Sequence, residues 1–292
     1  MIYGDVLPAG PGEARLTPQF YIAEDYRPDV SELNGQQKLA APILLPVDNI
    51  FSTSTDSLKV LQELTVILTE FTKALVFLAI NQLEPAQESV DKAIDRSQHE
   101  AFEGKEVLYL FASQIARLDK NYELAFSNIQ RALELNDNYG RAYIALANIY
   151  YDQGDYYSAK EIYKKADSLI DQPVGAYIDQ KASLGIGNIC SAQFQAVKRT
   201  ENPDPAALDE LEQLEQCSRN SYESVVNFYR QQERPEKSLK ELAARAYYGL
   251  GILDQETGQL QQAQQMLEQA LQLATGEKLI QRAETRLPKV KE

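Results

Sequence analysis

The stretch that decides the fold is Gly140–Asp171, which reads GRAYIALANIYYDQGDYYSAKEIYKKADSLID. Small or apolar residues in its first half recur every three or four positions, the spacing of one helix face: Tyr143, Leu146, Ala147 and Tyr150. After a turn at Gly154, the second half repeats this spacing: Ala159, Tyr163 and Ala166. Because the small residues let two helices approach closely while the large ones fill the gaps, the stretch predicts an antiparallel helical hairpin.

Three further segments carry the same pattern in the same register. The first lies in 106–139, with Tyr109, Ala112, Ala116, Ala125, Ile129 and Ala132. The second lies in 244–276, with Tyr247, Leu250, Gly251, Gly258, Ala263, Leu267 and Ala270. A looser copy precedes them in 67–105, with Ala74, Phe77, Ala86, Val90 and Ala93. The pattern resembles the tetratricopeptide-repeat family over 67–171 and 244–287. This resemblance implies a mainly α fold, an α-α superhelix with a repeat of about 34 residues.

The remainder of the predicted solenoid, which runs over 56–287, departs from this repeat. Residues 174–243 predict two long helices, at 177–199 and 205–232, which we interpret as one elongated, irregular repeat. Asp204 is placed to cap the second of these helices, and Pro205 suits its first position. The segment 277–287 predicts the polar-backed capping helix that such arrays need, with inward Leu279, Ala283 and Leu287.

Residues 1–50 predict β-structure instead. Two runs rich in β-forming residues, 2–7 and 15–22, flank a Pro- and Gly-rich turn, which favours a hairpin, and a further strand is expected at 40–45. The run Ile-Tyr-Gly and the later Phe-Tyr-Ile resemble the closing strands of a TolB amino-terminal-type α/β domain. An isolated hairpin is marginal in water, so these strands either cover the first helices or belong to a sheet that this chain lacks.

The charge balance narrows the classes of partner. With 29 basic and 43 acidic residues the chain has a formal net charge of −14, which argues against binding the nucleic-acid backbone or an anionic membrane. The longest apolar run, 75–80, is too short to span a bilayer, and no signal peptide is visible. We therefore expect a cytoplasmic location.

Residues with catalytic or metal-binding chemistry do not form a convincing constellation, so we expect no enzyme, cofactor or metal. The single histidine, His99, falls in a predicted inter-repeat loop and excludes a triad or most zinc sites. Cys190 and Cys217 fall in predicted helices and are interpreted as small buried apolar residues rather than as a disulfide. Gly185-Ile-Gly187 lacks the preceding strand of a nucleotide-binding turn. The carboxylate pairs between 209 and 215 are interpreted as a solvated helix face.

The family's geometry predicts where a partner would bind. Stacked repeats line a concave groove with first-helix residues, and carrying the family's positions over residue by residue predicts these: Leu110, Gln114, Arg117, Arg141, Ile144, Asn148, Tyr151, Arg245 and Tyr248. The three arginines suggest a partner with acidic groups. Apolar or aromatic residues stand where the family's carboxylate-clamping lysine would be, which favours an amphipathic helix or an extended peptide.

These observations predict a non-catalytic scaffold that binds a peptide or protein in the groove. The alternative is that the chain is the regulatory or sensory C-terminal region of a larger multidomain signalling protein, with the N-terminal strands docked on another domain. Neither the partner's identity nor the oligomeric state follows from the sequence.

Overall fold

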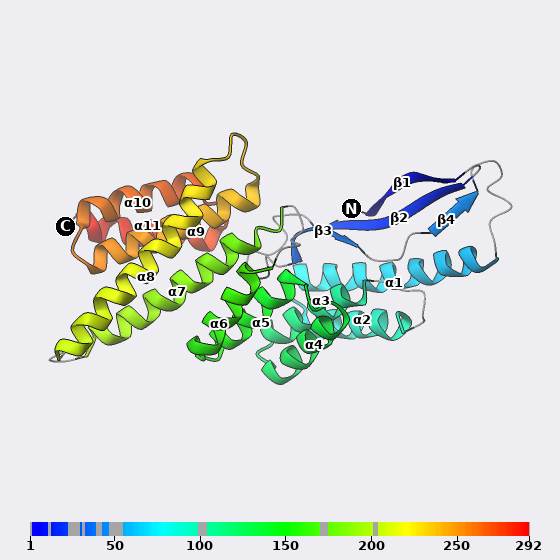
Figure 1. Cartoon of the computed structure of the whole chain (residues 1–292), viewed down its shortest axis with the longest axis horizontal. Helices are drawn as coiled ribbons and strands as arrows, with labels where there is room; N and C mark the ends of the chain where they lie inside the picture. Colours follow the sequence, from blue (N-terminus) through cyan, green and yellow to red (C-terminus); the bar gives the residue numbers. More distant parts are fainter. Residues whose placement is uncertain are drawn as a thin grey trace. The chain divides into compact units, whose positions relative to one another are not determined.

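A computed structural model of the chain describes residues 2–10, 13–22, 30, 33–38, 43–46, 55–98, 104–169, 175–200 and 204–291. In these ranges the chain forms four strands followed by eleven helices (Figure 1). The chain divides into two compact units. Unit 1 comprises residues 1–149 and 171–176, and unit 2 comprises 150–170 and 177–292. The boundary falls inside one helix.

The sheet of unit 1 is built around one central strand, β2 (Glu13–Ile22). β1 (Ile2–Gly10) pairs antiparallel with it from Ile2 opposite Phe20 to Gly10 opposite Glu13. The other edge of β2 is shared by β3 (Gly35–Lys38), which pairs with its second half, and β4 (Ile43–Pro46), which pairs with its first half. The predicted hairpin is thus confirmed, and the strand expected at 40–45 lies at β4.

Alternation along β2 explains why the sheet packs on helices. Phe20 and Ile22 are buried, whereas Tyr21 between them is partly exposed. The ring of Phe20 lies 5.0 Å from that of Phe71, which in turn lies 4.9 Å from that of Phe111, both in edge-to-face geometry. The strands therefore cover helices of their own unit, which is one of the two arrangements that the sequence allows.

The helices of unit 1 follow each other as antiparallel neighbours. They are α1 (Thr55–Ala79), α2 (Leu83–Arg96), α3 (Lys105–Leu118), α4 (Tyr122–Leu135) and the part of α5 (Gly140–Asp152) up to residue 149. Along α1 the fully packed positions recur as predicted by the 3.6-residue period: Leu64, Ile67, Phe71, Ala74 and Leu78. Asn121 caps α4, because its side chain accepts a hydrogen bond from the amide of Leu124 at 3.2 Å.

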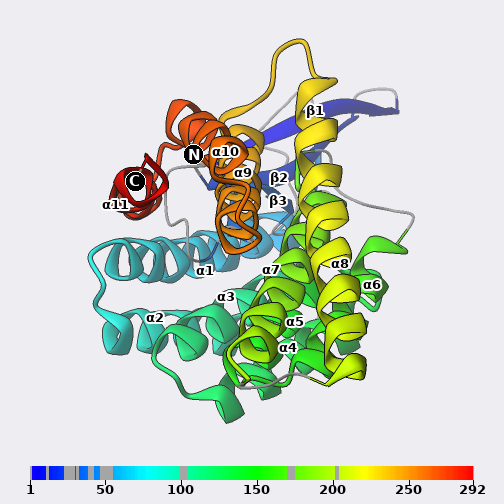
Figure 2. The same ribbon diagram turned by 90° about the vertical axis from the view of Figure 1, so that its left-hand side faces the viewer.

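The described part of unit 2 contains six whole helices, three of which have 20 residues or more. They are α6 (Tyr156–Asp167), α7 (Ile178–Lys198), α8 (Pro205–Arg230), α9 (Lys237–Glu256), α10 (Leu260–Leu273) and α11 (Glu277–Lys291). Both views show α7 and α8 running side by side over their length (Figures 1 and 2). Asp204 caps α8 by accepting from the amide of Ala207 at 2.8 Å, and Pro205 occupies its first turn. The two long helices predicted here are confirmed.

A disulfide between Cys190 of α7 and Cys217 of α8 corrects the sequence-based interpretation of the two cysteines. The sulfurs bond because the antiparallel hairpin brings the two helices into register, with Cα atoms 6.0 Å apart. The ammonium of Lys160 on α6 lies 3.5 Å from each sulfur. Since disulfides persist mainly in oxidising compartments, this bond does not support a cytoplasmic location, which stays a prediction.

The sequence thus predicts the fold class correctly, a helical solenoid preceded by a β-hairpin. It misses β3, whose residues Gly-Gln-Gln-Lys have poor β propensity. His99 lies outside the described residues. The division of the solenoid into repeats at 67–105, 106–139, 140–173, 174–243 and 244–276, with a cap at 277–287, remains a prediction.

Candidate functional site: the inner face of the repeats

The predicted groove residues are divided between the two units. Unit 1 holds Leu110, Gln114, Arg117, Arg141, Ile144 and Asn148, and unit 2 holds Tyr151, Arg245 and Tyr248. Four of the residues in unit 1 are buried: Leu110, Gln114, Arg141 and Ile144. These four side chains are therefore not exposed on a surface, contrary to the prediction from repeat position. The other five predicted residues are partly exposed.

Arg141 is the clearest correction, because its guanidinium is only 1% exposed. Its Nη1 donates to the carbonyl oxygen of Asn34 at 2.5 Å, and its Nη2 donates to that of Gln36 at 3.3 Å. The carbonyls of Asn34 and Gln36 are two residues apart, and carbonyls at this spacing point to the same edge of an extended chain. Arg141 therefore binds the edge of β3 that lies opposite β2. The predicted display of this positive charge to a partner is therefore wrong: the charge is used within the chain.

Tyr139 supports the same contact from the start of α5. Its hydroxyl donates to Oε1 of Gln37 at 3.3 Å, and Gln37 in turn donates to the carbonyl of Leu33 at 3.2 Å. Burial raises the pKa of Tyr139 well above its usual range, against the lowering effect of the charge on Arg141. The phenol is therefore a neutral hydrogen-bond donor at all physiological pH values.

The remaining residues of unit 1 form a smaller polar group. Nε of Arg117 donates to Oε1 of the buried Gln114 at 3.0 Å, so the arginine is partly committed to its own helix. Asn148 on α5 is partly exposed. Arg117 and Asn148 are therefore the partly exposed residues among the predicted positions of unit 1.

In unit 2 the half-exposed aromatic groups dominate the predicted positions. The ring of Tyr151, in the last turn of α5, lies 5.5 Å from that of Tyr156, and burial raises its pKa. Tyr248 on α9 packs against the buried pair Ala263 and Leu267 of α10. Arg245 is 30% exposed, and its Nε lies 3.5 Å from a carboxylate oxygen of Glu241.

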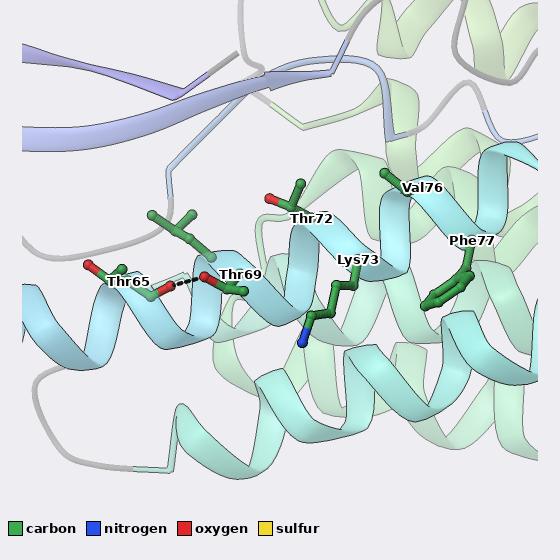
Figure 3. A pocket seen from close by; sticks show the side chains of 7 residues that line it. Thr65, Thr69, Thr72, Lys73, Val76 and Phe77 are labelled. Atoms are coloured by element: carbon green, nitrogen blue, oxygen red, sulfur yellow. Dashed lines mark hydrogen bonds between the residues drawn. The ribbon is translucent and has the colours of Figure 1, made fainter.

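A hollow that the sequence analysis did not identify runs along α1, with a volume of about 480 Å³ (Figure 3). Seven residues at helical spacing line it: Thr65, Leu68, Thr69, Thr72, Lys73, Val76 and Phe77. They lie mainly on the side of α1 away from its buried stripe. Val76 lines the hollow and is 56% exposed, and the place of this valine outside the periodic buried stripe is the sequence signal that could have indicated the hollow.

Acidic groups of unit 2 form an ion-pair network with a packing role. Arg219 lies 2.8 Å from a carboxylate oxygen of the nearly buried Asp254 and 3.2 Å from one of Glu215. Burial raises the pKa of Asp254, and the hydrogen bond and charge of Arg219 oppose that rise. The network joins α8 to α9. It pairs the buried carboxylate of Asp254 with a positive charge, because a buried charge without a partner would be strongly destabilising.

Metal binding and membrane spanning are two further classes of function to consider for the described residues. No group of three or more histidine, cysteine or acidic side chains there is arranged to hold a metal ion. None of the described helices combines the length and the apolar character needed to cross a bilayer.

Comparison with known proteins identifies the repeat. The tetratricopeptide-repeat profile matches residues 140–172 and 244–276, the two segments in which the sequence pattern is sharpest. No curated protein matches the chain.

Among solved structures, yeast Tom70 is similar with a TM-score of 0.56 at 15% identity, covering 81% of this chain and 42% of its own. YrrB, a tetratricopeptide-repeat protein with an unusual peptide-binding site, gives 0.40 at 15% identity, covering 79% of this chain and 97% of its own. A tetratricopeptide-repeat protein from Parabacteroides merdae gives 0.38 at 14% identity, with 78% and 100% covered. The chain thus spans less than half the length of Tom70, and at this identity the likeness concerns the fold.

Two profile matches, the helical hairpins that contain them and the Tom70-like fold agree with one another. The chain thus carries tetratricopeptide repeats at residues 140–172 and 244–276.

Proposed function

We propose that the chain is a non-catalytic scaffold that binds a peptide or protein segment on the inner face of its repeats. The observation that carries this proposal is the half-exposed pair Asn148 and Tyr151 on α5, the first helix of the repeat at 140–172. An amide and a phenol offer hydrogen bonds beside an apolar ring, a combination that suits an extended peptide or the face of a helix.

The chemistry of the partner follows from what the arginines already bind. Arg141 is committed to backbone carbonyls and Arg245 lies beside Glu241. The predicted preference for acidic groups depended on these guanidinium groups facing outward. We therefore propose a partner recognised mainly by apolar and amide contacts.

The test compares two tyrosines on opposite helices of one hairpin. Tyr151→Ala removes an inner-face ring, and Tyr157→Ala removes a ring that is 81% exposed on α6. Tagged wild type and both variants are used to capture proteins from an extract of the source cells, after circular dichroism has shown equal helix content. The proposal expects the Tyr151→Ala variant to lose partners that the Tyr157→Ala variant retains. Identical capture by all three proteins would contradict it.

A second candidate function is regulation within a larger signalling protein, and one observation favours it. Among the described strands none pairs with the outer edge of β1, a strand of nine residues, and an open edge of this length can accept another strand. Reading the gene upstream of the first codon tests this candidate. A continuous reading frame that encodes an α/β domain supports it, and an in-frame stop directly before the codon excludes it.

A further inference from the structure

The chain's own residues 33–38 occupy the inner face of unit 1. Leu33, Asn34 and Gln37 are buried, whereas Gln36 is exposed. Gln37 accepts a hydrogen bond from Tyr139, and the carbonyl of Asn34 accepts one from Arg141. The buried positions of this segment, with Gly35 between them, therefore follow the pattern Leu-Asn-Gly-x-Gln.

The place that this segment fills is a slot with two walls. One wall is the edge of β2, which pairs Gln19 to Ile22 with Lys38 to Gly35. The other wall is α5, where Arg141 holds two carbonyls and Tyr139 holds the side chain of Gln37. Most of these bonds go to backbone, so the slot selects an extended chain with few demands on its outward side chains.

The slot also requires glycine at position 35. Its φ is +92°, a value that residues with a Cβ rarely adopt, and a Cβ there would lie 3.2 Å from Nη2 of Arg141. The guanidinium can approach the strand closely because this atom is missing.

The resident strand is a weak occupant of the slot. β3 has four residues, Gly-Gln-Gln-Lys, and none of them is β-branched or aromatic. A segment with the same buried residues and a β-branched residue at the exposed position 36 would pair better with β2.

We propose that unit 1 binds its partner by strand exchange: an extended peptide of the pattern Leu-Asn-Gly-x-Gln displaces residues 33–38 from the slot between β2 and Arg141. This proposal rests on the scaffold function, and it adds the recognition mode and the partner's sequence pattern. Without a partner, residues 33–38 occupy the slot and act as an internal competitor. A partner must therefore bind the slot more tightly than they do.

The test uses fluorescent peptides and the full chain. The native probe has the sequence of residues 30–38, Val-Ser-Glu-Leu-Asn-Gly-Gln-Gln-Lys. A second, β-branched probe replaces Gln36 with Val at the outward position, and a third, glycine-free probe replaces Gly35 with Val. The proteins are wild type, Gly35→Val and the milder Gly35→Ala, which weaken the internal competitor. Gly154→Ala strains a turn of similar φ (+79°) in unit 2 and serves as the matched control.

The proposal expects the native probe to bind Gly35→Val at least tenfold more tightly than wild type, with Gly35→Ala between them and Gly154→Ala like wild type. The β-branched probe should bind every protein more tightly than the native probe, and the glycine-free probe should bind none. Hydrogen exchange should show that amides 35–38 are protected in wild type and released in Gly35→Val.

Equal affinity of the native probe for wild type and Gly35→Val, with amides 35–38 released, would overturn the proposal, as would tight binding of the glycine-free probe. A wild-type dimer that Gly35→Val abolishes without a gain in probe binding would assign the slot to a second copy of the chain and also overturn it. These outcomes do not depend on capture through Tyr151, so strand exchange and the scaffold function can fail separately.

Discussion

At the residue scale, Tyr222 shows why the first helices of these repeats carry glycine. Its ring lies between α7 and α9: a Cβ on Gly187 would lie 2.7 Å from Cε1, and a Cβ on Gly249 would collide with Cζ. Its hydroxyl donates to Oδ1 of Asn188 at 2.9 Å, which satisfies the buried phenol. The same logic applies at Gly185, where a Cβ would collide with the ring of Tyr163. Each glycine makes room for a large residue of the neighbouring helix.

Replacing Gly249 with alanine should therefore destabilise unit 2 by about 1–3 kcal/mol, because the added methyl overpacks the core. The sign is diagnostic, since alanine in an unhindered helix position stabilises by roughly 1 kcal/mol relative to glycine. Urea unfolding measures the change. In a Tyr222→Leu background the cost should shrink, and an equal cost in both backgrounds would contradict the proposed packing.

Asp155 should give the repeat at 140–172 a specific acid sensitivity. Its carboxylate caps α6 by accepting from the amide of Ser158 at 3.0 Å, and hydrogen bonding to Ser158 lowers its pKa below the usual 3.8. A lowered folded-state pKa contributes stability above 3.8 that is lost as the pH falls through the folded value. Asp155→Asn keeps a capping oxygen without titrating. The difference in unfolding free energy between wild type and Asp155→Asn should be constant above about pH 5 and change below pH 4; a difference independent of pH would refute this.

How well single residues can be predicted from sequence depends on how local their contacts are. Asp204 caps α8 through the amide of Ala207, three residues further on, and Pro205 stands in the first turn of the same helix. Both are predicted correctly. Arg141 contacts Asn34 and Gln36 more than a hundred positions away, through carbonyls that have no sequence signature. Position within a repeat indicates which side of the helix Arg141 lies on, but it cannot show that the chain itself fills that side.

At the scale of elements, the α7–α8 hairpin shows a signal that the sequence contained but that helix periodicity did not reveal. Cys190 and Cys217 lie at nearly equal distances along the chain from Pro203, between the two helices. In an antiparallel hairpin such residues lie opposite each other, as Ser218 and Gly187 also do through their 3.1 Å hydrogen bond. Taking the predicted hairpin register into account would have paired the cysteines.

Reducing this disulfide should lower the stability of unit 2 by about 3.5 kcal/mol on the chain-entropy model for a loop of this length. The bond closes a loop with a sequence separation of 27 residues, which the unfolded chain explores freely once the bond is cut. Denaturant unfolding with and without a thiol reductant gives the value. The Cys190→Ser/Cys217→Ser double variant is the control. It should match the reduced wild type and be insensitive to reductant, and a reductant effect that persists in it would show that the loss has another source.

At the scale of the whole molecule, a repeat array transmits stability only between neighbours. The disulfide belongs to unit 2, whereas the sheet and the Arg141 contacts belong to unit 1. Reduction should therefore raise hydrogen exchange in α7, α8 and α9 and leave β2 and α3 unchanged. Faster exchange of similar size throughout the chain would show that it unfolds as one cooperative body.

The overall architecture is the part that the sequence predicts best, since helix periodicity and recurring small residues extend over most of the chain. Two features of unit 1 are harder to predict. β3 lacks β-forming residues, and the hollow along α1 depends on which face of that helix the rest of unit 1 leaves uncovered. Both arise from packing between distant segments, and a local pattern does not encode it.

The central claim is that the inner face of the repeats, and not the outer one, meets the partner. Site-specific photo-crosslinking in living cells tests it most directly, with a benzophenone amino acid placed at position 151 in one protein and at position 157 in another. We expect a discrete crosslinked partner from position 151 and none from position 157. A partner crosslinked from position 157 alone would contradict it.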